Sequence, residues 1–222
     1  MRGRWILFFL FTFYTGYLSA QAPVPVIKEP RHHLALENKY VRLIDVHIPP
    51  GDTTLYHIHA APSIIVILSS SVVGSALMNG KPSSGPVTPG ATSFAAYKEH
   101  PITHHVWNEG KNMYHVMDIE WVEHDTASGV FPEYHQEGFH LNWEEHGVRS
   151  YTLNTTQNDS IRINGNAYAH LLIGVRSTAR LRVAQEHAVY KKELSAGQFL
   201  FFQPGTSVNI QGQAEIVMLE LK

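Results

Sequence analysis

The sequence predicts an all-β protein built as an antiparallel sandwich or barrel. After residue 22 the chain offers short runs of β-branched and aromatic residues, separated by Gly, Pro, Asn and Ser, in place of long amphipathic helical periodicity. Short strands at this spacing, with Asn-Gly turns at Asn79-Gly80 and Asn164-Gly165, are typical of such folds. The clearest runs are residues 40–46, 64–68, 71–77, 115–121, 171–175, 199–202 and 216–221.

Two halves of the chain repeat the same pattern, which predicts a duplicated domain. Each half has two adjacent apolar runs, then a strand that follows a glycine, and finally an apolar strand that carries a glutamate. A repeat of about 100 residues indicates duplication and not a solenoid. We expect domains at 23–122 and 151–222. Residues 123–150 lack strand periodicity and are expected to form a linker or a lid.

The first 22 residues have the organisation of a secretory signal peptide. Arg2 and Arg4 precede an apolar stretch from Trp5 to about Tyr17, and Ala20-Gln21-Ala22 fits a cleavage site. A membrane-spanning helix needs about 20 apolar residues, and this stretch is shorter and is broken by Thr, Gly and Ser. We therefore expect a secreted or periplasmic protein that has no membrane segment after cleavage.

The composition excludes several classes of function. The sequence has no cysteine, which excludes disulfides, thiolate metal sites and cysteine nucleophiles. The net charge is −2 and no basic run follows the signal, so nucleic acid is not an expected partner. Motifs of P-loop, Rossmann and hydrolase-elbow sites are absent from the sequence. The 15 histidines, against 17 Lys and Arg, favour metal binding or a response to pH.

His57 and His59 are the strongest candidates for metal ligands. On a strand these two side chains point to the same face, so two imidazoles could bind one ion without moving the backbone. A third ligand must come from another segment, and residues 97–108 offer His104 and His105 on opposite faces of a strand. Periodicity alone does not decide which of the two faces inward.

The motifs around these histidines resemble those of the cupin superfamily. Pro50-Gly51 followed by His57-Ile58-His59 is similar to the first cupin motif, Gly-x5-His-x-His-x3,4-Glu-x6-Gly. The second motif ends in His-x3-Asn, which His104 and Asn108 match. The resemblance implies that His104 is the inward ligand and that Asn108 turns the chain after it. It also implies a two-barrel jelly roll in which the C-terminal barrel is degenerate and holds no metal.

The sequence departs from the cupin pattern in two places. The family's glutamate should fall at Ser63 or Ile64, and the second motif has about three extra residues between Gly90 and His104. The resemblance therefore implies a three-histidine site like that of the thiol dioxygenases within the superfamily. Alternatively, another acid completes the ligand set, and the candidates are Glu99, Glu120 and Asp118.

The other histidines are assigned simpler roles. His105 and His115 are expected to face outward or to pack, and His32 and His33 to be solvated near the mature N-terminus. The histidines of the expected linker could line a lid over the site but fit a polar exposed segment better; they are His124, His135, His140 and His146.

Two hypotheses for function follow, with a weaker third. The first is an exported metalloenzyme of dioxygenase, isomerase or lyase type that acts on a small oxygen-bearing molecule. Its cofactor would be one divalent ion, with Fe, Mn, Zn, Ni and Cu all compatible with imidazole ligands. The second is a non-catalytic cupin that binds a small molecule or a sugar, and the third is a metal-handling protein. A homodimer is compatible with each hypothesis.

Overall fold

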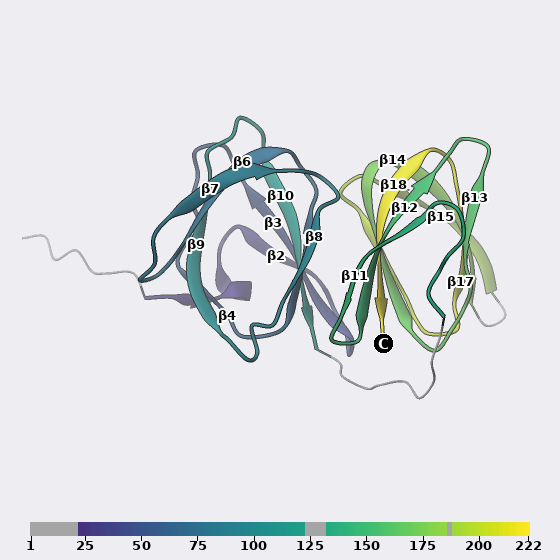
Figure 1. The fold of residues 1–222 in the computed structure, drawn as a ribbon, viewed down its shortest axis with the longest axis horizontal. Coiled ribbons are helices and arrows are strands. Elements are labelled where there is room, and N and C mark those ends of the chain that lie inside the picture. Colours follow the sequence, from purple (N-terminus) through teal and green to yellow (C-terminus); the bar gives the residue numbers. More distant parts are fainter. Residues whose placement is uncertain (1–21, 123–131, 186–187) are drawn as a thin grey trace, which may run out of the picture.

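The computed structural model describes residues 22–122, 132–185 and 188–222 and shows two β-barrels side by side (Figure 1). Apart from one 3-10 turn, η1 (Val26–Lys28), the regular structure of these residues consists of strands. No helix in this part of the chain is long and apolar enough to cross a membrane. The all-β fold class predicted from the sequence is confirmed.

The first barrel is made of two five-stranded sheets. Their strand orders are β1-β4-β9-β6-β7 and β2-β3-β10-β5-β8. Side chains of both sheets, including Val46 and Val106, pack together inside. The strands are β1 (Val24–Pro25), β2 (His32–Glu37), β3 (Val41–Ile48), β4 (His57–His59), β5 (Ser63–Ile67), β6 (Ser71–Leu77), β7 (Ser83–Val87), β8 (Thr92–Ala95), β9 (Ile102–Asn108) and β10 (Tyr114–Trp121).

The second barrel repeats this arrangement, with one long strand serving two sheets. The first part of β14 pairs with β18 and β16, and the last part pairs with β17 and β15. The resulting orders, β11-β12-β18-β14-β16 and β13-β17-β14-β15, match β2-β3-β10-β5-β8 and β4-β9-β6-β7. The strands are β11 (Phe139–Glu145), β12 (Val148–Thr155), β13 (Ser160–Ile163), β14 (Ala169–Gln185), β15 (Ala188–Ser195), β16 (Phe199–Phe202), β17 (Ser207–Gln211) and β18 (Ala214–Leu221).

A repeated ion-pair network aligns the two barrels residue by residue. Arg42 contacts Glu37 at 2.9 Å and Glu120 at 2.7 Å, and each partner lies directly across a strand pair. In the second barrel, Arg149 contacts Glu144 at 2.7 Å and Glu220 at 3.3 Å, again across β11-β12 and β12-β18. The glutamate that the sequence repeat places on each final strand therefore has the same structural partner in both halves.

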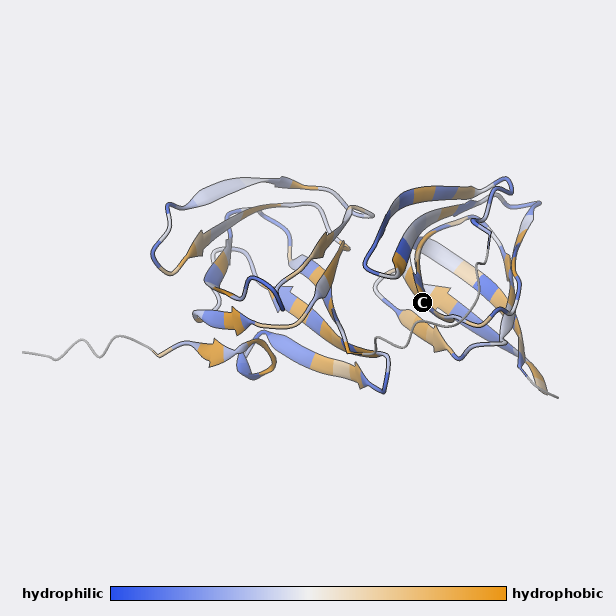
Figure 2. Cartoon of the chain, turned by 60° about the horizontal axis from the view of Figure 1, so that its bottom comes forward, coloured by the Kyte–Doolittle hydropathy of each residue, from blue (hydrophilic) through white to orange (hydrophobic). Residues whose placement is uncertain are grey.

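The two barrels share one apolar core. One face of β3, β5 and β10 packs against one face of β12, β14 and β18, and the buried residues include Ile64, Ile119, Leu171 and Leu219. Apolar and polar segments alternate along many strands (Figure 2), because successive side chains point to opposite faces. Strands of the shared core have apolar side chains on both faces, as expected for a sheet covered on both sides.

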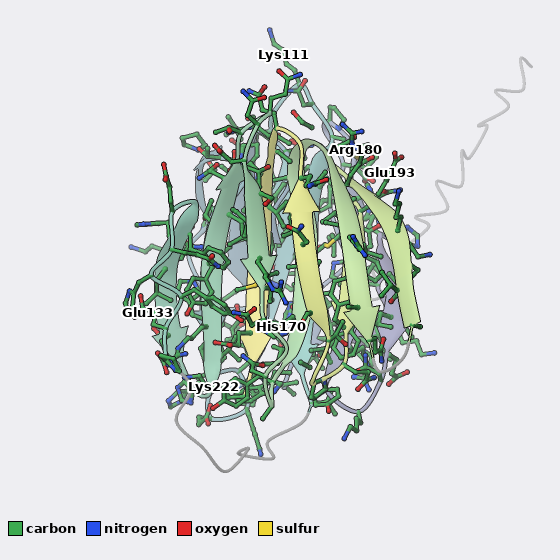
Figure 3. The ribbon with its side chains drawn as sticks, turned by 90° about the vertical axis from the view of Figure 1, so that its right-hand side faces the viewer. Lys111, Glu133, His170, Arg180, Glu193 and Lys222 are labelled. Carbon is green, nitrogen blue, oxygen red and sulfur yellow. The ribbon has the colours of Figure 1, made fainter. Side chains whose placement is uncertain are left out.

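The second barrel differs from the first in how its interior is filled. Tyr151, Leu172, Leu181 and Ile210 belong to a large buried apolar cluster inside it. Figure 3 looks onto this barrel, with His170 among the strands and Arg180 and Glu193 near its margin. His170 is 1% exposed, and its Nε2 lies 3.7 Å from a carboxylate oxygen of Glu220.

The expectation for residues 123–150 needs correction. Residues 139–145 form β11 and residues 148–150 begin β12, so this part belongs to the sheet of the second barrel. The alternation of apolar and polar residues is weak in β11, because it is an edge strand of half-buried and exposed residues. Its pairing with β12 also has an irregularity between Leu141 and Trp143. Residues 123–131, like the predicted signal peptide up to residue 21, lie outside the described residues.

The shared core predicts that the two barrels unfold together. Leu171→Ala removes a fully buried side chain between them and should lower the free energy of unfolding by about 2–5 kcal/mol. Val189→Ala, at a position that is 58% exposed, should change it by less than about 0.5 kcal/mol. Urea denaturation measures both values. Two separate transitions, or equal effects of the two substitutions, would contradict the shared core.

Candidate metal centre

Strands β4 and β9 bring His57, His59 and His104 together inside the first barrel. His57 lies directly opposite His104 in the antiparallel pair, and His59 lies two residues further along β4 on the same face. One ligand atom from each side chain lies within 4.8 Å of the other two. The ring centroids of the three pairs are 4.6–5.0 Å apart.

The backbone around these strands is fixed by two motif residues. Gly51 has a φ of 76° in the turn before β4, a conformation that favours glycine, and its amide donates to the Asn108 carbonyl at 2.8 Å. The buried Asn108 amide donates to the carbonyls of Ile48 and Asn112 and accepts from Ser71. Asn108 thus ties the end of β9 to neighbouring segments, as the His-x3-Asn motif predicts.

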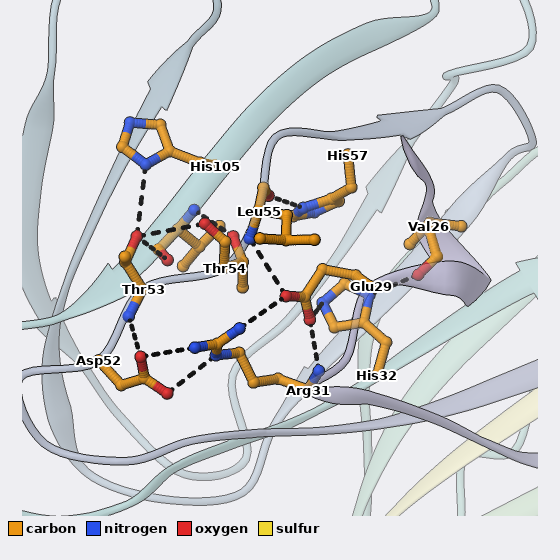
Figure 4. A network of polar contacts seen from close by, with 11 residues as sticks. Val26, Glu29, Arg31, His32, Asp52, Thr53, Thr54, Leu55, His57 and His105 are labelled. Carbon is orange, nitrogen blue, oxygen red and sulfur yellow. Dashed lines mark hydrogen bonds and ion pairs between the residues drawn. The ribbon is translucent and has the colours of Figure 1, made fainter. Parts of the chain in front are cut away.

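Residues of the N-terminal segment form hydrogen bonds and ion pairs with residues 52–55, which lead into β4 (Figure 4). Val24 pairs with His57 in a short parallel ladder. The buried Glu29 carboxylate accepts from the backbone amides of Arg31 at 2.6 Å and Leu55 at 3.1 Å. Arg31 also makes two hydrogen bonds to Asp52, at 2.7 and 2.8 Å. Residues 52–55 are therefore clamped just before the histidine strand begins.

Hydrogen bonds fix the orientation of two imidazoles. The Nδ1 of His57 lies 2.9 Å from the Leu55 carbonyl oxygen, and that of His32 lies 2.9 Å from the Val26 carbonyl oxygen. A carbonyl oxygen only accepts, so each Nδ1 carries the proton and each Nε2 keeps its lone pair. The carbonyl partner of a metal-binding histidine selects the tautomer in this way.

Burial keeps the histidines neutral. Burial, with smaller contributions from the neighbouring imidazoles, lowers the pKa of His59 to about 2 and that of His104 to about 3. The pKa of His57 is lowered mainly by burial. Neutral imidazoles at pH 7 have free lone pairs, which is the protonation state that binds a metal ion.

Asp118 on β10 brings a carboxylate to the same interior. Its Oδ2 lies 3.4 Å from the Nδ1 of His59, and the side chain is almost completely buried. Burial, with a smaller contribution from the charge of Glu120, raises the pKa of Asp118 to about 7. A nearby cation would lower this pKa and stabilise the carboxylate.

Unpartnered polar atoms show that these residues fit a metal ion. His59 Nδ1, His104 Nε2 and both carboxylate oxygens of Asp118 are buried without a hydrogen-bond partner. Leaving such groups unpaired costs about 1–3 kcal/mol each. A divalent ion held by the three imidazoles, with Asp118 Oδ2 accepting a hydrogen bond from His59 Nδ1, would satisfy both imidazole nitrogens and this carboxylate oxygen.

The histidines open into a cavity of about 220 Å³. Its lining combines apolar side chains with polar ones, and the polar residues besides the three histidines are His32, Ser75, Tyr97, Tyr114 and Asp118. The apolar lining residues are Val46, Ile48, Ile65, Val73, Val106 and Val116. No Lys or Arg is found among the described residues that line it.

The structure also decides between alternatives that the sequence left open. His104 lines the cavity, whereas His105 lies outside it against Tyr56, with ring centroids 4.5 Å apart. Ile64 belongs to the core between the barrels. Ser63 is one residue away, so its buried side chain points to the opposite face of β5, toward the barrel interior.

Among the three candidate acids, only Asp118 lines the cavity. Glu99 is exposed in the turn after β8, and Glu120 is engaged by Arg42. Asp118 stands beside His59 and outside the group of mutually close ligand atoms. It is therefore better placed to orient His59 than to bind the ion itself.

His32 was expected to be solvated, and this expectation was wrong. Its side chain is buried, lines the cavity and lies edge-on to His57 with centroids 4.7 Å apart. Burial lowers its pKa to about 3. Sequence spacing gave no signal for this contact, because the N-terminal segment is brought to β4 by Glu29 and the short β1-β4 ladder. His33 is exposed, as expected.

The second barrel has apolar residues at the equivalent positions. The paired positions on the inner face of β13 and β17 are Ile161–Ile210 and Ile163–Val208, where β4 and β9 have the pair His57–His104. Asp118 corresponds in the same way to Met218. These side chains are all buried in one cluster of apolar and aromatic residues, so metal-binding side chains are replaced by apolar ones at these described positions.

Solved structures with the same fold include enzymes and storage proteins. Streptomyces albus HEPD, with 2-hydroxyethylphosphonate and Fe(II) bound, has a TM-score of 0.59 and 8% identity over 86% of this chain and 70% of its own. Oxalate decarboxylase from Lactobacillus farciminis, in complex with formate, has a TM-score of 0.58 and 10% identity over 85% of this chain and 82% of its own. Vicilin from tomato, Solanum lycopersicum, has a TM-score of 0.56 and 10% identity, and the match covers 82% of this chain and 75% of the vicilin chain.

These similarities define the fold of the chain. It is an all-β cupin jelly roll with two barrels, as the motif resemblance implied. No protein-family profile matches the sequence, and no curated protein matches it.

The clamp before β4 predicts a specific loss of stability. Glu29→Ala would leave the Leu55 amide and Arg31 without their carboxylate, and it should lower the free energy of unfolding by about 1–3 kcal/mol. Glu37→Ala removes an acid that is 53% exposed and should cost at most about 1 kcal/mol. Chemical denaturation compares the two variants, and an equal loss would argue against the clamp.

Proposed function

We propose that this protein is an exported, metal-dependent cupin enzyme whose active site is the cavity of the first barrel. The observation that carries the proposal is the set of buried, unpartnered atoms around His57, His59 and His104. Such an arrangement is costly in a protein that holds no ion and is relieved when an ion binds. Among the proteins of similar fold, HEPD was solved with Fe(II) bound.

The three histidines would hold the ion and leave coordination positions open toward the cavity. Three neutral imidazoles leave the ion its full double charge, so it would supply Lewis-acid or oxygen-activating chemistry at the open positions. Asp118 would keep His59 in the required tautomer and orientation, as carboxylates beside metal-bound histidines do. Imidazole ligands suit Fe, Zn, Ni and Cu, so ligand type does not select the ion.

The cavity wall indicates the chemistry of the substrate. A cavity of about 150 Å³ accepts benzene, so 220 Å³ suits a compact molecule. The apolar wall favours a hydrocarbon portion, and the histidine end favours an oxygen that binds the ion. The described lining has no Lys or Arg to neutralise further negative charge. We therefore favour a small, neutral or singly charged substrate with an apolar body.

Export is part of the same proposal. It is supported by the basic, apolar and small-residue pattern of residues 1–22. The intact mass of the protein recovered from the secreted or periplasmic fraction should place the mature N-terminus near Gln21 or Pro23. Retention of residues 1–22 would contradict export through signal cleavage.

Metal content is the test of the site. In protein produced without a histidine tag, we expect His57→Ala and His104→Ala to abolish retention of the ion at the cavity, because each removes one of three ligands. His105→Ala is the matched control, since it alters the neighbouring side chain of β9 outside the cavity. Elemental analysis gives the metal content and far-ultraviolet circular dichroism checks the fold.

Equal metal loss in His104→Ala and His105→Ala would contradict the proposed ligand set. Catalysis is tested on the same preparations by screening for oxygen consumption if iron is present. A coordination sphere closed by four protein ligands, or purified protein without metal, would favour the non-catalytic binding module instead.

Asp118→Asn tests the orienting carboxylate. The variant keeps the shape of the side chain but loses its charge, and we expect the affinity for the ion to fall about 10–100-fold. Glu99→Gln, which removes the charge of an exposed candidate acid that does not line the cavity, is the matched control and should leave the affinity unchanged. Competition with a metal chelator measures both affinities. Unchanged affinity in Asp118→Asn would remove Asp118 from the site.

A further inference from the structure

A second cluster of metal-binding side chains lies outside the cavity, near the junction of the two barrels. Asp45 and His47 lie two residues apart on β3, and His115 lies directly opposite His47 on β10. One ligand atom from each side chain lies within 4.8 Å of the other two. Asp45 and His47 continue the face of β3 whose Val41 and Leu43 pack between the barrels.

The geometry of this cluster is already close to that of a bound ion. His115 Nε2 lies 2.7 Å and His47 Nδ1 lies 3.8 Å from the same Asp45 oxygen. An ion bound tetrahedrally about 2.0–2.1 Å from each ligand would hold these atoms about 3.3 Å apart. Binding an ion would therefore change these two distances by about half an ångström, and it would also draw together the ligand atoms of His47 and His115, which lie within 4.8 Å of each other.

The ligands are held in place by their surroundings. The rings of His47 and His115 stack, with centroids 4.1 Å apart and planes inclined by 22°. The backbone of His115 is held by two hydrogen bonds. Its amide donates to Ser69 Oγ at 2.8 Å, and its carbonyl accepts from the Leu68 amide at 2.9 Å. Gly197 of the second barrel lies against the His115 ring, where an added Cβ would come within 3.1 Å of it. The cluster is thus built by rigid elements of both barrels.

The cluster is open enough for an ion to enter. The side chains of His47, Asp45 and His115 are 37%, 26% and 18% exposed. His33 on the adjacent strand β2 lies nearby, with its ring centroid 6.3 Å from that of His47. Water, or His33 after a change of side-chain conformation, could occupy a fourth position.

We propose that Asp45, His47 and His115 form a second metal site, selective for a borderline divalent transition-metal ion such as Zn²⁺. Two imidazoles and one carboxylate form a ligand set suited to such ions, whereas Ca²⁺ and Mg²⁺ prefer oxygen ligands alone. The site is independent of the cavity, because none of its residues lines the cavity. It binds an ion at the rim of the contact between the two barrels.

Zn²⁺ binding to the full chain without a histidine tag tests the proposal. After removal of bound metal, the wild-type protein should take up two equivalents of Zn²⁺ in a calorimetric titration confirmed by elemental analysis. His47→Ala and the conservative Asp45→Asn should each lose one equivalent or weaken it at least 10-fold. His140→Ala, which removes an exposed histidine of β11, is the matched control and should retain both equivalents.

The outcomes separate this site from the cavity. Loss of one equivalent in His104→Ala and of the other in His47→Ala supports two sites. If His47→Ala binds Zn²⁺ as the wild type does, or if His140→Ala weakens binding equally, the second site is overturned whatever happens in the cavity. If His104→Ala alone has no effect, the cavity site fails while the second site stands.

Discussion

The central constraint in the first barrel is that three neutral imidazoles and one carboxylate are buried close together, with their lone pairs directed into the same interior. Three imidazoles and one carboxylate lie in an interior whose other walls are largely apolar, with buried nitrogen and oxygen atoms that no protein group pairs. Because desolvation disfavours charge, the imidazoles remain neutral and the carboxylate is poorly stabilised. The motif glycine, the Asn108 hydrogen bonds and the Glu29 clamp all fix the backbone that brings these groups together. A bound ion would turn this unfavourable arrangement into a favourable one.

The second barrel has the same strand plan as the first but, among the described residues, lacks imidazoles and a carboxylate at the positions equivalent to those of the candidate metal centre. The strand orders and the Arg–Glu pairs are repeated, so both barrels are built on one plan. Where β4 and β9 of the first barrel have histidines and β10 has Asp118, the corresponding strands of the second barrel have isoleucine, valine and a methionine. These side chains belong to a large buried apolar cluster, whereas the first barrel has a cavity of about 220 Å³ beside its histidines. The second barrel then contributes one wall of the shared apolar core, which supports β3, β5 and β10 from the side away from the site.

Much of this could be predicted from the sequence, where the information is local. The strand pattern, the duplication and the shared face of His57 and His59 follow from alternation and spacing. The inward position of His104 did not follow from periodicity, because either face of β9 is compatible with the pattern, and it came from the resemblance to the cupin motif. The strand β11 was missed because an edge strand with a bulge has weak alternation.

The remaining features depend on contacts between distant segments. His32 reaches the cavity only because the N-terminal segment is clamped beside β4. Asp118 could be singled out from Glu99 and Glu120 only after the register of β10 was known, since the sequence alone does not show which acid faces the histidines. His47 and His115 lie far apart in the sequence and meet through the pairing of β3 with β10. Residue spacing predicts which side chains share a face of one strand, but it does not predict which residues of two different strands come into contact.

The central claim is that the three imidazoles of the first barrel hold a metal ion. The most direct measurement is an anomalous-scattering map from crystals of the tag-free protein, collected at the absorption edge of the metal found by elemental analysis. The account predicts a peak about 2.0–2.2 Å from a nitrogen of each of His57, His59 and His104, with Asp118 hydrogen-bonded to His59. A cavity without a peak, in which the histidines bond only to water and to one another, would contradict it.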